Sequence, residues 1–161
     1  MDSRIAPLAE ILRLNTKLFR NCLEDLSDEQ AAMRPSGATN NAAFVAAHLT
    51  NSRFYLLKVL GIEEPDPLAP YLDGRTSLDN VQTLPPITDI QAAWTKAAHL
   101  LRDRLDALTP ADLDAPSTAK FPLFNGTLMG TLTFLVQHDS YHVGQLSLLR
   151  KYSGLPAMRF Q

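Results

Sequence analysis

The chain has 161 residues, of which 45% are hydrophobic, and its formal net charge is -2 with a pI near 6.0. This length is that of one ordinary domain, residues 1–161, with enough apolar side chains for a buried core. The interspersed charges argue against a nucleic-acid-binding protein, which would present a clustered basic face. The single cysteine, Cys22, excludes an internal disulfide and any multi-cysteine metal site.

Neither a targeting segment nor a membrane span is predicted. The first ten residues, MDSRIAPLAE, lack a basic segment followed by an apolar run, so we expect no signal peptide. No apolar stretch approaches the ~18 residues that a spanning helix needs. We therefore expect a soluble, cytoplasmic protein with no membrane partner.

Apolar residues spaced three and four apart predict long amphipathic α-helices. The predicted helices cover residues 5–26, 41–60, 88–108 and 127–152. The loop SGATNN before the second helix ends in residues that favour an N-cap, and Gly61 is a fitting C-terminal glycine. Thr88 and Gln91 predict a capping box at the start of the third helix, and Gly154 follows the fourth.

The connections between these helices differ in length. Ser27 and Gln30 form a capping-box pattern in a short turn, and TPADLDAP at 109–116 predicts another turn. Residues 62–87 hold five of the eleven prolines and show no periodicity, which predicts a long connection. Long helices without a convincing strand indicate an all-α fold, a four-helix bundle with a crossover connection between helices 2 and 3.

The stretch HDSYH at 138–142 places two histidines four residues apart, on one face of the fourth helix. His142 falls on the apolar seam of that helix, and His138 flanks it. His48 lies on a largely apolar surface of the second helix. Helix bundles build metal sites from side chains on facing helices, so His48, His138 and His142 predict a three-nitrogen site. Such a site leaves a position open for water or substrate, as catalytic metal sites do.

The same pattern has a plainer interpretation. A histidine pair at this spacing often arises by chance, and a buried histidine is usually a hydrogen-bonded core residue. The fourth histidine, His99, points away from the apolar stripe of its helix and is expected to face solvent. A protease related to the HExxH enzymes is disfavoured, because Asp139 is one methylene shorter than glutamate and is directed inward.

Polar side chains close to the three histidines are candidates for supporting the site or lining a pocket: Asn15, Asn51, Asp139 and Gln145. Asn15 lies on the inner stripe of the first helix, and Asn51 follows His48 by one turn. Asp139 could orient a histidine, and Gln145 shares the face of His138. For each of them, ordinary packing or hydrogen bonding in the bundle is the alternative. Cys22 lies on an apolar stripe and is expected to be a core residue rather than a nucleophile.

Segments of the chain resemble the DinB-like superfamily of bacterial four-helix proteins. They are LSDEQAAMRP at 26–35, AAHL at 46–49 and VQHDSYHVGQLSLLRKYSGLP at 136–156. The resemblance covers nearly the whole chain and is strongest in HDxYHxGQLxxLRxxxGLP. It implies that His48, His138 and His142 bind a divalent metal ion, nickel or zinc, and that the protein is a homodimer.

The resemblance also suggests a reaction. Relatives with a known activity are largely metal-dependent enzymes that use bacillithiol, mycothiol or related thiols, and this chain looks like their short, single-domain type. The expected function is that of a metal-dependent transferase acting with a low-molecular-weight thiol on a small electrophile. A metal-dependent small-molecule hydrolase is an alternative, as is a non-catalytic protein with a structural metal or a ligand pocket.

Overall fold

A computed structural model describes residues 2–72, 77–119, 121 and 125–160. The helices of these residues are α1 (Ala6–Leu23), α2 (Asp28–Ala32), α3 (Ala42–Val59), α4 (Ala69–Leu72), the 3-10 helix η1 (Leu78–Asn80), α5 (Ile87–Asp106), α6 (Pro110–Asp114) and α7 (Leu128–Tyr152). No strand occurs in these ranges, where Pro116 and Thr127 form an isolated β-bridge. The prediction of an all-α fold is confirmed.

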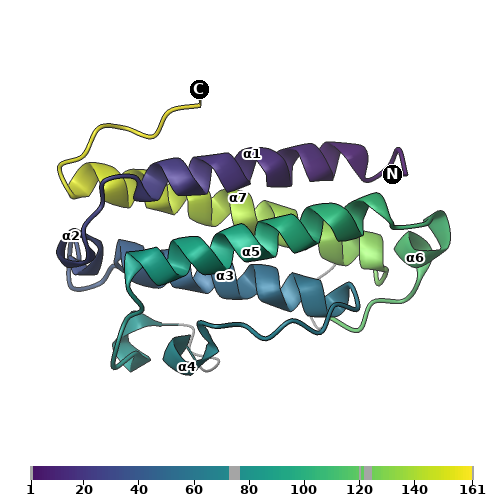
Figure 1. Cartoon of the computed structure of the whole chain (residues 1–161), viewed down its shortest axis with the longest axis horizontal. Helices are drawn as coiled ribbons and strands as arrows, with labels where there is room; N and C mark the ends of the chain where they lie inside the picture. The colour runs from purple at the N-terminus through teal and green to yellow at the C-terminus, as the bar shows by residue number, and fades with distance from the viewer. Residues whose placement is uncertain (1, 73–76, 120, 122–124, 161) are drawn as a thin grey trace.

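The four long helices form a bundle in which α1 packs on α5 and α7, and α3 packs on the same two helices. In Figure 1, α1 and α7 run in one direction, while α3 and α5 both run in the opposite direction. Since α3 and α5 are parallel, the chain between them has to return along the length of the bundle. The predicted crossover connection is therefore confirmed, and it contains α4 and η1, which were not predicted. Residues 73–76 of this connection lie outside the described residues.

The predicted end of the first helix is wrong by three residues, because α1 stops at Leu23 rather than at residue 26. Glu24 has an extended backbone, and Asp25 has a φ of 59°, in the left-handed region. These two residues turn the chain so that Ser27 can cap α2. There the predicted capping box is present, with Ser27 Oγ accepting from the Gln30 amide.

The predicted capping box of the third long helix is also wrong. Helix α5 begins at Ile87, before Thr88, and its N-cap residue Pro86 makes no side-chain cap. The Ile87 amide instead donates to Asp28 Oδ1 of α2 at 2.8 Å. A residue distant in sequence thus accepts from one of the free amides that every helix start leaves.

Three predicted helix ends of the two histidine-bearing helices are confirmed, at Asn41, Gly61 and Gly154. Asn41 Oδ1 accepts from the Phe44 amide at the start of α3, and Gly61 follows that helix with a φ of 81°. Gly154 follows α7 with a φ of 80°, and Thr127 caps the start of α7, which was not predicted. Only glycine adopts this left-handed conformation without a steric penalty, which defines where both helices end.

The core of the bundle is largely apolar but encloses an ion pair. Phe19 of α1 stacks on Trp94 of α5, with ring centroids 3.8 Å apart. Cys22 lies nearby on α1 and is 1% exposed, so its predicted place in the core is confirmed. Arg53 of α3 and Asp139 of α7 are buried together at the centre of the bundle.

Within the described ranges, no helix combines the length and hydropathy that a bilayer crossing requires.

Candidate metal centre

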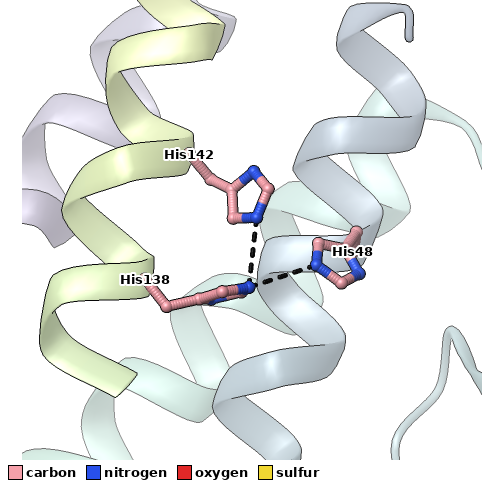
Figure 2. Close-up of side chains that lie close together, drawn as sticks. All are labelled: His48, His138 and His142. Atoms are coloured by element: carbon pink, nitrogen blue, oxygen red, sulfur yellow. Dashed lines mark hydrogen bonds between the residues drawn. The ribbon is translucent and has the colours of Figure 1, made fainter. Parts of the chain in front are cut away.

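The three predicted histidines lie together at the contact between α3 and α7. Figure 2 shows that His138 and His142 project from successive turns of α7, and that His48 faces them from α3. All three side chains are half-buried. His99, in contrast, is exposed on α5, as predicted.

The separations of the ring nitrogens fit a bound metal ion. His138 Nε2 lies 3.3 Å from His48 Nε2 and 3.1 Å from His142 Nε2. Two nitrogens bound to one ion at roughly 2.0–2.1 Å are about 3.0 Å apart at a right angle and about 3.4 Å apart at the tetrahedral angle. The three ligand atoms all lie within 4.8 Å of one another, so these histidines could hold one metal ion.

Gln145 orients one of these rings. Its Oε1 lies 2.7 Å from His142 Nδ1, and its Nε2 donates to the Tyr141 hydroxyl at 3.1 Å. Because the amide oxygen can only accept, the proton of a neutral His142 ring resides on Nδ1. The lone pair of His142 Nε2 then faces the other two histidines, which is the tautomer that a metal ion requires.

His138 is oriented by packing instead. Its Nδ1 is buried and has no hydrogen-bond partner among the described residues. The ring stacks against Phe134, one turn earlier on α7, at a centroid distance of 6.5 Å and an interplanar angle of 22°. The two histidines of α7 are therefore held by different means, one by a hydrogen bond and the other by an aromatic neighbour.

The electrostatics of the site favour neutral rings. Burial, and then the proximity of His142 and His138, lower the pKa of His48 to about 4. Burial and then His142 lower the pKa of His138 to about 4, against the opposing charge of Asp139. Burial also lowers the pKa of His142, although Gln145 and Asp139 act in the opposite direction. Metal ions bind unprotonated imidazole, so the rings are in the ligating state at neutral pH.

Asp139 directs its carboxylate toward Arg53. Oδ1 accepts from Arg53 Nε at 3.2 Å, and Oδ2 accepts from Arg53 Nη2 at 2.8 Å. Its influence on the histidines is thus electrostatic, through the pKa of His138 and His142, rather than an orienting hydrogen bond. Sequence reasoning missed Arg53, although a cation four residues after Leu49 and four before Leu57 lies on a core-facing stripe of α3.

The two asparagines have different surroundings. Asn15 donates to Ser140 Oγ at 2.9 Å and so links α1 to α7. Asn51 lies one turn after His48 and donates to Asp66 Oδ2 at 2.6 Å. Asp66 belongs to the crossover connection, which is thereby attached to α3 beside the histidines.

A cavity of about 520 Å³ opens next to the histidines. Its described lining is formed by His48, Asn51, Ser52, Tyr55, Thr118, Phe121, Phe134, Leu135 and His138. Of the predicted neighbours, the cavity includes Asn51, whereas Asn15, Asp139 and Gln145 are not among these lining residues. Thr118 and Phe121 come from the segment between α6 and α7, in which residues 120 and 122–124 lie outside the described residues. No helical periodicity marks this segment, so no sequence pattern selected these two residues.

The sequence also matches the profile of a known protein family, the DinB superfamily, over residues 11–146. The matched range includes all three histidines. The chain belongs to the DinB superfamily. No curated protein is significantly similar to it.

The fold of this DinB-superfamily protein is similar to that of a conserved protein from Enterococcus faecalis, known from a crystal structure. The two superpose with a TM-score of 0.71 at 14% sequence identity, over 94% of this chain and 97% of the other. At this low identity, the likeness is one of fold alone. It extends the similarity beyond residues 11–146 to nearly the whole bundle.

Proposed function

We propose that the protein is a metal-dependent transferase that joins a low-molecular-weight thiol to a small electrophile. The observation that carries the proposal is the convergence of three neutral imidazoles beside a cavity. Three protein ligands leave at least one position open, which is typical of a catalytic metal rather than a structural one. Thiol chemistry is the commonest known activity among DinB-like proteins, and nickel or zinc is the ion we expect.

The residues of the chain have separate roles in this reaction. His48, His138 and His142 would hold the ion, and Gln145 keeps His142 in the ligating tautomer. A divalent ion at this place would supply Lewis acidity that favours the thiolate form of a bound thiol. Cys22 cannot replace the bound thiol as the nucleophile, because burial raises the pKa of the Cys22 thiol to about 12.

The transfer conserves atoms and charge in a simple way. The sulfur of the thiol forms a bond to the electrophilic carbon, and the leaving group departs with the electron pair of the bond that breaks. The thiol proton passes to solvent. The wall of the cavity would hold the electrophile and limit the access of water to it.

The first experiment measures the metal content of protein purified without a nickel column. We expect close to one divalent ion per chain, strongly reduced in His48→Ala and in His142→Ala. His99→Ala is the matched control, because His99 is an exposed histidine outside the site. A wild-type protein that neither contains metal nor gains it on incubation with zinc or nickel would refute the proposal.

The second experiment measures the loss of free thiol with a panel of electrophiles, in parallel with the hydrolysis of a panel of esters and amides. We expect thiol consumption that is abolished by chelation and by His142→Ala, and retained in His99→Ala. Hydrolysis without thiol consumption would contradict the transferase assignment and favour a hydrolase. Metal binding without either activity would contradict both.

A further inference from the structure

The cavity beside the histidines has a continuous aromatic wall. Phe121 stacks on Phe134, with ring centroids 4.7 Å apart and an interplanar angle of 16°. Tyr55 meets the edge of Phe121 at 5.6 Å and 69°. Phe134 in turn stacks on the ring of His138, so the wall leads from the surface to the candidate metal ligands.

The wall is assembled from distant parts of the chain. Tyr55 comes from α3, Phe134 comes from α7, and Phe121 comes from the segment that precedes α7. Tyr55 is 40% exposed, so part of its ring is accessible from solvent. An exposed ring that continues a stacked aromatic series offers a surface to which another flat ring can add.

Among the residues that the structure describes, the polar groups that line the cavity carry no charge at neutral pH. Among the described lining residues, the polar side chains other than the histidines and Tyr55 are Asn51, Ser52 and Thr118. Ser52 already donates its hydroxyl to the carbonyl of His48 at 3.0 Å. A charged ligand group placed here would lose hydration without gaining a partner of opposite charge among these residues.

The carboxylate that contacts the lining residue Asn51 is engaged by two hydrogen bonds. Asp66 Oδ2 accepts from Asn51, and its Oδ1 accepts from the amide of Leu68 at 2.8 Å. Asn51 turns its amide nitrogen toward Asp66, which leaves its Oδ1 as an acceptor for a neutral N–H or O–H group. The described lining of the cavity thus combines an aromatic face with a neutral acceptor, Asn51 Oδ1.

We propose that this cavity binds a flat, uncharged aromatic group of the electrophile, which lies against Tyr55, Phe121 and Phe134 with its reactive atom toward the histidines. The direction of the reactive atom rests on the proposed function. The preference for a flat, neutral ring does not depend on the proposed function, because the aromatic wall and the uncharged described lining account for this preference. The substrate class is therefore a neutral aryl electrophile rather than an aliphatic or anionic one.

The test is a binding titration that is monitored by ligand-observed NMR and uses three probes of similar size. Benzamide is flat and neutral, cyclohexanecarboxamide is neutral but not flat, and benzoate is flat but anionic. The titrations use metal-free protein and protein with one equivalent of zinc, since a carboxylate can also ligate the ion. We expect benzamide to bind the metal-free protein more tightly than the other two probes do. We also expect it to bind the zinc form.

Two variants locate the binding site. Tyr55→Leu and Phe134→Leu each keep an apolar side chain but remove an aromatic face, and we expect each to weaken benzamide binding about threefold to tenfold. Tyr55 is partly exposed, so its replacement leaves the core intact. Tyr152→Leu is the matched control, because Tyr152 is a 64% exposed tyrosine at the end of α7, outside the cavity.

The outcomes separate this inference from the proposed function. Equal binding of the two carboxamides, tighter binding of benzoate to the metal-free protein, or unchanged affinity in both aromatic variants would overturn the inference. Ring-selective binding lost in Tyr55→Leu and Phe134→Leu supports it, even if no electrophile consumes thiol, in which case only the proposed reaction fails. Thiol transfer with no preference for aryl electrophiles would leave the reaction standing and overturn the inference.

Discussion

Replacement of Asp139 by leucine tests how the buried ion pair at the centre of the bundle contributes to stability. Both partners are 3% exposed, and Arg53 donates two charge-assisted hydrogen bonds to the carboxylate. Each such bond contributes roughly 1.5–3 kcal/mol. Without Asp139, Arg53 would still donate to Thr16 Oγ1 and the Leu12 carbonyl, and its guanidinium would still lie 3.5 Å from the centre of the Trp94 ring.

Because these remaining contacts offset part of the loss, we expect Asp139→Leu to lower the free energy of unfolding by about 3–5 kcal/mol. The double variant Arg53→Met with Asp139→Leu removes the unpaired charge along with its partner. It should recover most of that loss and lie within about 1 kcal/mol of the wild type, because apolar replacements of a buried ion pair are often neutral.

The assay is urea unfolding followed by far-ultraviolet circular dichroism, in the presence of a chelator so that bound metal adds no stability. If the free energy of unfolding falls with urea concentration at the same slope in all proteins, the variants unfold from the same compact state as the wild type. A loss of less than about 1 kcal/mol in Asp139→Leu, or a double variant as unstable as the single one, would contradict this prediction.

Three further predictions concern the site and the core. Gln145→Leu should weaken zinc affinity about 10–100-fold in a competition titration, because His142 loses its orienting partner, while Gln137→Leu, at an exposed position of α7, should leave it unchanged. Metal-free protein should lose stability as the pH falls from about 6.5 toward 4. In that window the histidines of the unfolded chain bind protons, whereas His48 and His138 of the folded protein, with pKa values of about 4, do not. The free energy of unfolding should therefore change by up to about 2.7 kcal/mol per pH unit, as measured by urea titrations at several pH values. A free energy of unfolding that does not change with pH would contradict this prediction. Cys22 should react with a thiol reagent only on unfolding, since it is buried with a raised pKa, and rapid labelling of the native protein would show that α1 opens.

The local signals of the sequence were accurate where neighbouring residues decide the outcome. Asn41 and Gly61 bound α3, and Gly154 ends α7, because a cap depends on a few adjacent backbone groups. The start of α5 was misplaced for the opposite reason. There the amide of Ile87 is satisfied by Asp28, a residue that the sequence gives no reason to pair with it.

Part of the candidate metal site could also be predicted from the sequence. The spacing of His138 and His142 requires that they share a face of one helix, and Gln145 lies one turn beyond His142. That His48 would meet them across the helix contact was an expectation drawn from apolar character and from the family resemblance. The aromatic wall was not expected, since Phe121 lies in a segment without periodicity.

The sequence by itself determined the four long helices, the caps at Asn41, Gly61 and Gly154, and the histidine pair, because these depend on residues within a few positions of one another. Only the tertiary structure decided that His48 Nε2 lies 3.3 Å from His138 Nε2, and that Arg53 joins Asp139 in the core. The same holds for the cavity that α3, α7 and the segment before α7 line. These features arise where helices distant in sequence pack together, and the packing of whole helix faces, rather than any local preference, sets the distances between them.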